Sequence, residues 1–275
     1  MPRVIKLTYK NHFNETVDFG SAGYYAGSGD IRDYEWTVTQ KGNRISQLSR
    51  AVTTRRLPIV ITAATEAAAY TLRNRIMEIT EKDVLAMQPG KLICGGYYFQ
   101  CYATASKKTG WNRSDRTLVL ELTLTSDRPV WVKESSFSFR QDSGGTSAYL
   151  DFPYDFPFDY SNSFAQQDLQ NSSFVGTDFR IDIFGSCVNP SITIADHIYG
   201  VTCELADGEY LTIDSQKKTV IKTAVDGAQT NFFNSRNKDS YIFEAIPAGT
   251  SAVAWSGAFD FDVTLLEERS EPKWT

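Results

Sequence analysis

The residues most suggestive of chemistry are three aspartates that recur at every fourth position near the middle of the chain. Asp151, Asp155 and Asp159 lie in the segment DFPYDFPFDY. Glycosidases hold their paired carboxylates about 5 to 5.5 Å or about 6.5 to 9.5 Å apart. Four residues of extended or polyproline chain would instead separate consecutive aspartates by about 12 to 13 Å. The segment also lacks the alternate acidic positions, central glycine and distal glutamate of a calcium-binding EF-hand loop. We therefore expect neither site here.

Histidine and cysteine are too sparse for the other common catalytic and metal sites. Cys187, His197 and Cys203 lack the short spacing and the fourth ligand of a structural zinc site. His12 is the only other histidine, and the sequence contains neither a nucleophile elbow nor a phosphate-binding glycine loop. Four cysteines are too few for a disulfide scaffold at this length, so free thiols are expected. The sequence predicts a protein that is not an enzyme and has no metal or other cofactor.

Composition and charge narrow the class of partner. With 41% hydrophobic and 22% charged residues, the chain has the composition of a soluble globular protein. Residues 1–135 carry 19 basic against 13 acidic residues and residues 136–275 carry 9 against 20, giving net charges of +6 and -11. Either the two halves are unrelated domains with ordinary solvated faces, or they face different partners. The basic residues form no compact stripe, and no apolar run is long enough to span a bilayer, so neither nucleic-acid recognition nor direct membrane binding is expected.

The first half is predicted to be a β-rich domain, residues 1–135, around one amphipathic helix. Residues 5–9 and residues 35–39, around Trp36 and Val38, have the alternation of strands with one buried face, and further strands are expected at 56–63 and at 116–125. The last places Leu118, Leu120, Leu122 and Leu124 on one face. In residues 65–80, Thr65 is a candidate N-cap and the apolar stripe is formed by Ala69, Leu72, Ile76 and Ile79.

A two-residue turn and a set of short strands complete the predicted elements. Gly95 and Gly96 are expected to join residues 91–94 and 97–106 in a β-hairpin, in which Cys94 and Cys101 do not face each other. Residues 174–275 are predicted to form an antiparallel sandwich with strands at 178–184, 191–194, 198–205, 210–214, 219–223, 241–245, 252–255 and 259–267. Its aromatic residues either stack on a bound sugar or belong to the core; the candidates are Tyr210, Phe232, Phe233 and Trp255.

The connecting segment, residues 136–173, contains the repeat DFPYDFPFDY and is too aromatic for a flexible tether. In an extended chain successive side chains point to opposite faces, so the aspartates and prolines occupy one face and the aromatic rings the other. We expect an ordered strap whose rings pack on one or both domains: Phe152, Tyr154, Phe156, Phe158 and Tyr160.

The order of these parts resembles the distal tail protein family of long-tailed, siphovirus-like bacteriophages and prophages. The resemblance covers essentially the whole chain and depends on four short motifs in this order: YDFPFDY at 154–160, GEYLTIDSQKKTV at 208–220, IPAGTSAV at 246–253 and EPKW at 271–274. It implies a mainly β protein of the α+β type, with a ring-forming first domain and a galectin-like jelly-roll second domain at residues 174–275.

The same resemblance implies a structural role in the virion. Members of the family form a homohexameric ring between the tail tube protein and the tip or baseplate hub, and their second domain can support receptor-binding proteins. Residues 197–199 are HIY rather than the start of the H-x-N-x-R motif of sugar-binding galectins, and no W-G precedes the E-E-R at 267–269. The resemblance therefore does not imply that this chain binds glycans. A free-standing carbohydrate-binding β-sandwich protein remains the alternative.

A ring-forming domain needs strand edges and apolar faces that meet neighbouring copies. In this sequence the leucine-rich strand and the two-glycine hairpin are the candidates, with plain pairing inside one chain as the alternative. The candidate oligomerisation residues are Leu118, Leu120, Leu122, Leu124, Gly95 and Gly96.

Overall fold

The chain forms two compact units. A computed structural model describes residues 7–21, 23–27, 29–110, 116–141 and 165–273. The first unit comprises residues 1–133 with 268–275, and the second comprises residues 134–267. The chain leaves the first unit within strand β10 (Trp131–Phe139) and returns within strand β21 (Phe261–Arg269). The last residues therefore belong to the first unit, which no local pattern in the sequence predicted.

The connecting segment differs from the expectation at both ends. The first of its residues, 136–139, form the end of β10, and residues 165–171 form a strand, β11 (Ala165–Asn171). Both belong to the second unit. The aromatic strap, with Phe152, Tyr154, Phe156, Phe158 and Tyr160, lies outside the described residues, so its packing stays a prediction.

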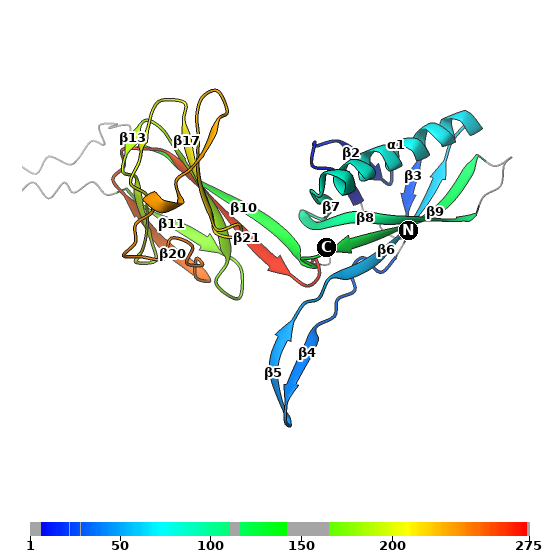
Figure 1. Cartoon of the computed structure of the whole chain (residues 1–275), viewed down its shortest axis with the longest axis horizontal. Coiled ribbons are helices and arrows are strands. Elements are labelled where there is room, and N and C mark those ends of the chain that lie inside the picture. The colour runs from blue at the N-terminus through cyan, green and yellow to red at the C-terminus, as the bar shows by residue number, and fades with distance from the viewer. Residues whose placement is uncertain (1–6, 22, 28, 111–115, 142–164, 274–275) are drawn as a thin grey trace, which may run out of the picture. The chain divides into compact units, whose positions relative to one another are not determined.

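In the first unit the sheet is covered on one face by the helix α1 (Glu66–Ala86) (Figure 1). The long strand β8 pairs with β7 through its first half and with β9 through its second, giving the orders β2-β1-β7-β8 and β3-β6-β9-β8. The bounds are β1 (Leu7–Lys10), β2 (Thr16–Phe19), β3 (Tyr24–Ala26), β6 (Thr53–Thr62), β7 (Gly90–Cys94), β8 (Tyr97–Gly110) and β9 (Thr117–Ser126).

Helix α1 begins where the sequence predicts. The side-chain oxygen of Thr65 accepts a hydrogen bond from the backbone N–H of Ala68 at 3.2 Å, which satisfies one of the free donors of the first turn. The buried face of the helix packs on the sheet through Ala69, Ile76 and Ile79, as expected from their spacing. Among the described residues, no helix is long and apolar enough to cross a membrane.

The helix continues past the predicted segment to Ala86. In the second half of the helix the buried face carries the polar residues Thr80 and Asp83. The regular repeat of apolar residues seen in the first half of the helix therefore does not continue in the sequence. Met87 ends the helix in the left-handed conformation with φ of 52°, and its backbone N–H donates to Val84. The extension therefore depends on buried polar contacts that helical periodicity does not reveal.

The hairpin at Gly95 and Gly96 has the predicted two-residue turn. Their φ angles of 57° and 82° are both positive, as a type I′ turn requires, and glycine adopts these values without steric cost. The turn joins β7 to β8, and Cys94 and Cys101 are buried free thiols.

Thiol chemistry provides a direct check on the second unit. Cys187 is a partly buried free thiol, and burial raises its pKa to about 11. Only the thiolate reacts with alkylating reagents, so at pH 8 we expect labelling of Cys187 to be roughly a hundredfold slower than that of an ordinary cysteine with a pKa of about 8.5. The rate should rise about tenfold per pH unit between pH 8 and 10, because this range lies below the raised pKa. Peptide mass spectrometry of the labelled native protein measures the labelling rate of Cys187. Labelling at pH 8 as fast as that of an ordinary cysteine would contradict the expectation.

The second unit is a sandwich of two antiparallel sheets, as predicted. One sheet has the order β19-β18-β17-β12-β21-β10, and the other has the order β11-β20-β14-β15. The remaining bounds are β12 (Asp178–Phe184), β13 (Cys187–Val188), β14 (Ser191–Ile194), β15 (His197–Gly200), β16 (Glu204–Leu205), β17 (Tyr210–Asp214), β18 (Thr219–Thr223), β19 (Gln229–Asn231), the 3-10 helix η1 (Phe233–Ser235) and β20 (Gly249–Trp255).

The core of the second unit lies between these sheets. Alternate residues of β12 and β17 face it from one side, and Leu169, Ile192 and Val253 face it from the other. Two strand predictions were wrong. Residues 198–205 split between β15 and β16, and residues 241–245 form no strand, although Ile242 and Phe243 are buried in the core. Adjacent buried residues in a loop produce an apolar run that resembles a short strand.

Candidate assembly surface

A two-stranded hairpin, here called the arm, is the most exposed element of the first unit. Its strands are β4 (Thr37–Lys41) and β5 (Arg44–Ser49), joined by the turn Gly42-Asn43. Figure 1 shows the arm extending away from the rest of this unit. The sequence predicted a strand at residues 35–39 with one buried face. This was wrong about burial, since every residue of β4 is exposed.

A register shift gives the arm one apolar face. Val38 pairs with Leu48, and after a shift between Thr39 and Gln40, Gln40 pairs with Ile45. Residues paired across strands, and residues two apart within a strand, share a face. Val38, Leu48 and Ile45 therefore lie together, although Ile45 and Leu48, three positions apart, would face opposite sides of a regular strand. The apolar face of the arm thus depends on the bulge.

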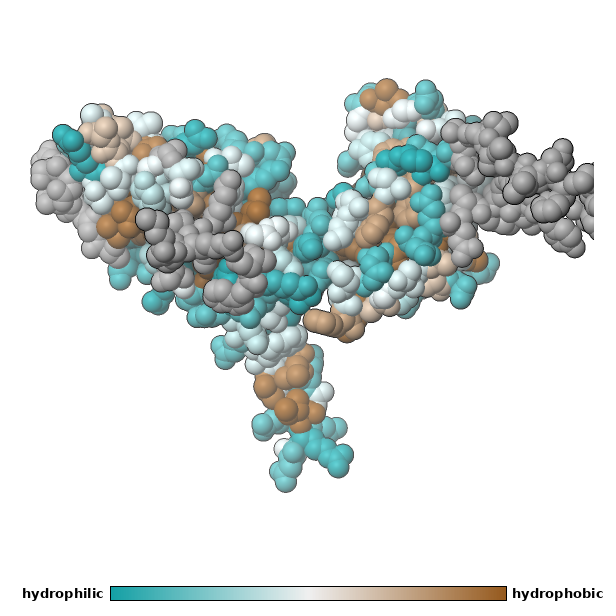
Figure 2. Space-filling view, turned by 180° about the vertical axis from the view of Figure 1, so that it is seen from behind, coloured by the Kyte–Doolittle hydropathy of each residue, from teal (hydrophilic) through white to brown (hydrophobic). Residues whose placement is uncertain are grey.

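This apolar face has no partner within the part of the chain that the structure describes. Val38, Ile45 and Leu48 are 47%, 63% and 54% exposed. Figure 2 shows hydrophobic residues gathered along the arm. An isolated two-stranded hairpin is marginally stable in water, and an exposed apolar surface marks an interaction site. The geometry therefore favours an arm that is completed by another molecule.

The root of the arm is anchored to the first unit. The guanidinium of Arg50 lies 4.2 Å from the ring centroid of Trp36, and one of its N–H groups donates to the hydroxyl of Ser270 at 3.0 Å. Burial lowers the pKa of Arg50, but a guanidinium stays charged at any physiological pH. The cation–π contact and the hydrogen bond fix where the arm leaves the unit.

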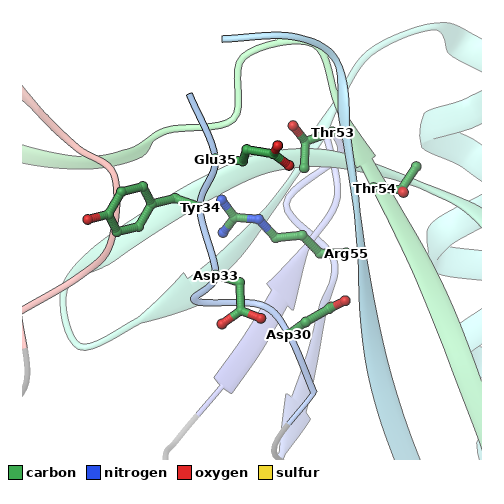
Figure 3. Close-up of a pocket in the computed structure, with 7 residues that line it drawn as sticks. All are labelled: Asp30, Asp33, Tyr34, Glu35, Thr53, Thr54 and Arg55. Atoms are coloured by element: carbon green, nitrogen blue, oxygen red, sulfur yellow. The ribbon is translucent and has the colours of Figure 1, made fainter. Parts of the chain in front are cut away.

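A pocket, here called the root pocket, opens beside this anchor with a volume of about 200 Å³. Arg55 forms its buried part, with 2% of the residue exposed, and donates from Nη1 to the carbonyl of Ile31. Its guanidinium also lies 4.4 Å from the ring centroid of Phe99. Figure 3 shows this side chain reaching toward the segment that carries the acidic residues. The lining residues are Asp30, Asp33, Tyr34, Glu35, Thr53, Thr54 and Arg55.

Charge dominates the root pocket. Burial lowers the pKa of Arg55, and the nearby carboxylates of Asp30 and Asp33 act in the opposite direction. Asp30 also accepts a hydrogen bond from the backbone N–H of Arg56. With Glu35, the described lining residues include three acidic side chains and one buried guanidinium. The pocket is therefore expected to attract a cationic group.

The oligomerisation residues predicted from the sequence lie elsewhere. The side chains of Leu118, Leu120, Leu122 and Leu124 are at most 5% exposed and belong to the core of the first unit, and β9 is paired along both edges, with β6 and β8. A contact between copies at β9 would have to use the opposite face of the strand. Gly95 and Gly96 are exposed at their turn, with space around both. Whether either element meets a second copy stays a prediction.

The arm itself was missed in the sequence, although a signal existed. Gly42-Asn43 is a two-residue hairpin signal, and Gly42 has the positive φ of 62° that such turns need. The polar residues around Ile45 and the irregular spacing to Leu48 obscured the second strand.

Of the aromatic residues considered for sugar stacking, only Tyr210 is exposed. Trp255 is buried in the core, and Phe232 and Phe233 pack against it. Tyr210 pairs across strands with Phe184 beside a depression of about 380 Å³ on the outer face of the sheet. Its other lining residues form a hydrogen-bonded cluster, in which Asp182 accepts from Arg180 at 3.0 Å and from Thr212 at 2.7 Å. No cluster of metal-binding side chains occurs in the described ranges.

Three solved structures that are similar to this chain are of phage hub and baseplate proteins. No family model matches the chain, and no curated protein matches it. The Dit protein of phage SPP1, described as a paradigm of the hub adsorption apparatus in phages that infect Gram-positive bacteria, is similar with a TM-score of 0.56 and 9% identity, over 96% of this chain and 99% of that one. Chains of the phage p2 baseplate in its activated conformation, with calcium and with strontium, give TM-scores of 0.65 and 0.66 at 11% identity, over 98% of this chain and 100% of theirs. The chain has the fold of these hub and baseplate proteins.

Proposed function

We propose that this chain is a distal tail protein, a structural component of the tail tip or baseplate of a tailed phage, and that it resides in the virion. The observation that carries the proposal is the length of the structural match, which spans both units and nearly all of each compared chain. A fold can host several functions. The exposed arm adds an independent reason to expect assembly.

The assembly we propose is a homohexameric ring built by the first unit, which joins the tail tube to the tip. A contact between two different patches of the same chain is heterologous, and it closes into a ring when its rotation allows. The arm supplies one such patch, because its apolar face has no partner among the described residues of its own chain. Six copies are what the resemblance to distal tail proteins implies.

The second unit supplies the remaining partners in this proposal. Its sandwich would support tip proteins, including receptor-binding proteins, while the first unit contacts the tube protein and the baseplate hub. The opposite net charges of the two halves of the sequence, +6 for residues 1–135 and -11 for residues 136–275, fit a protein whose two parts meet different neighbours. The role is non-enzymatic.

The location in the particle tests this function. Antibodies against the chain, applied to particles of the phage or prophage that encodes it, should label the end of the tail that is distal to the head. Native mass spectrometry of the purified full-length chain should show a six-membered species. Particles that lack the protein, together with a chain that remains monomeric, would overturn the proposal.

Carbohydrate binding is a second candidate, favoured by the depression beside Tyr210. It combines two aromatic rings with Arg180, Asp182 and Thr212, the mixture of apolar surface and convergent polar groups found in small-molecule sites. A glycan array followed by titration calorimetry on the intact chain tests it. Binding that Tyr210→Ala abolishes would support this function, whereas absence of binding across the array would exclude the sugars tested.

A further inference from the structure

We propose that the positively charged tip of the arm, residues 41–44, binds in the acidic root pocket of the next copy of the chain. The inference deepens the proposed ring and rests on it. The contact would be heterologous, since tip and pocket are different patches of the first unit.

The arm tip concentrates positive charge in an unfavourable arrangement. Lys41 and Arg44 pair directly across the end of the hairpin, so both side chains leave the same face. Like charges in this position repel and destabilise a hairpin. Both residues are exposed, and in the part of the chain that the structure describes neither one forms a salt bridge. An acidic partner would relieve this repulsion.

The root pocket has the opposite charge. Asp33 and Glu35 are exposed and make no salt bridge in the described residues. Arg55, the one cation among the described lining residues, is buried against Phe99 and donates to the carbonyl of Ile31. Figure 3 shows the side chains of Glu35 and Asp33 above and below the guanidinium of Arg55 in this view. Asp30, Asp33 and Glu35 outnumber Arg55 among the described lining residues, so the pocket keeps an excess of negative charge that favours an incoming cation.

The dimensions and chemistry of the pocket suit a side chain better than a separate ligand. Its volume of about 200 Å³ is below the roughly 300 to 1,000 Å³ of typical small-molecule sites. Tyr34, which is 55% exposed, offers a ring face to an incoming cation. The pocket therefore fits the ends of long basic side chains.

A second copy of this chain explains both surfaces together. An anionic ligand would neutralise the basic side chains of the tip but leave the carboxylates of the root pocket without a cation. A free cation would neutralise the pocket but leave the tip without an anion. One heterologous contact between copies neutralises Lys41 and Arg44 against Asp33 and Glu35 at the same time. The apolar face of the arm lies on the side opposite these charges, so it stays available for packing while the charges set the register.

Charge exchange tests the contact. Lys41→Glu with Arg44→Glu should weaken assembly about tenfold or more per contact, because each attraction becomes a repulsion. Asp33→Lys with Glu35→Lys should do the same. The variant that combines all four substitutions exchanges the two signs and should restore assembly. Lys238→Glu with Lys273→Glu is the control for net charge, since both residues are exposed and lie outside the arm and the root pocket.

Two readouts keep the proposed contact separate from the proposed function. The first is the fraction of rings in native mass spectra, and the second is complementation of a phage that lacks the gene. Rescue by the fourfold variant would support the contact. Unchanged assembly after charge reversal, or failure of the fourfold variant to recover while its circular dichroism stays native, would overturn it. If the unmodified chain neither forms rings nor complements, the proposed function fails instead.

Discussion

Replacing Asp83 with alanine is expected to destabilise the first unit by about 3 kcal/mol or more. Asp83 is fully buried, and its carboxylate accepts from the hydroxyl of Tyr9 at 2.6 Å, from the backbone N–H of His12 at 2.9 Å and from Nδ1 of His12 at 2.6 Å. Alanine would leave these donors unpaired away from water. Burial also raises the pKa of Tyr9 well above its usual value, so the phenol remains a neutral donor with no other acceptor among the described contacts.

The loss of stability should appear in the first unit only. For a domain of this size, 3 kcal/mol corresponds to a decrease in melting temperature of roughly 6 to 12 °C. Scanning calorimetry measures it, and hydrogen exchange assigns the shift to peptides of the first or the second unit. Glu81→Ala is the matched control, because Glu81 is an exposed acid on the same helix. Alanine favours the helix in both variants, so equal stability of the two would contradict a structural role for the carboxylate.

Replacing Val38, Ile45 and Leu48 together with threonine is expected to prevent formation of the proposed ring while leaving the single chain folded. These side chains are about half exposed in the single chain, and covering an aliphatic side chain completely contributes about 1.5 to 3 kcal/mol. Three of them at each contact would contribute roughly 2 to 4 kcal/mol to association, after allowing for the part of each side chain that is already covered. Losing this contribution would lower the association constant about 30-fold to 1,000-fold. Threonine keeps the preference for strands, so the hairpin should survive.

The measurement compares assembly with stability in the same sample. Native mass spectrometry or sedimentation gives the ring fraction, and the melting temperature should change by no more than surface substitutions usually cause. Val225→Thr, at an exposed valine of the second unit, is the control for hydrophobicity, and Gln47→Thr changes the polar face of the same arm. Rings that persist in the triple variant would show that the arm does not carry the contact.

Local sequence patterns were sufficient to predict the bounds of several strands and the start of the helix. Strands β12, β14, β17 and β18 have the bounds that the sequence predicts, because one face of each meets a core and the other does not. The start of α1 followed from a capping side chain and an apolar stripe. The same reasoning identified the alternation in β9, but it could not show whether the leucines face their own core or a neighbour.

The buried acid of α1 and the candidate assembly surface depend on contacts that no local pattern contains. The residues that bond to Asp83 lie 74 and 71 positions away, so the sequence around it resembles a solvated helix face. The apolar face of the arm exists because a register shift turns Ile45 to the side of Leu48. The root pocket joins residues on either side of the arm, and only the folded chain brings them together.

The sequence by itself thus determined a mainly β chain with one helix, a sandwich in its second half and a resemblance to phage tail proteins that the structural match supports. These conclusions depend on periodicity, turns and the order of parts, which are properties of neighbouring residues. Tertiary structure decided that the leucine side chains of β9 lie in the core of their own unit and that, among the described residues, the arm and the root pocket are exposed. The physical reason is that the burial of a side chain depends on residues that are distant from it in the sequence. These residues pack on it only in the folded chain.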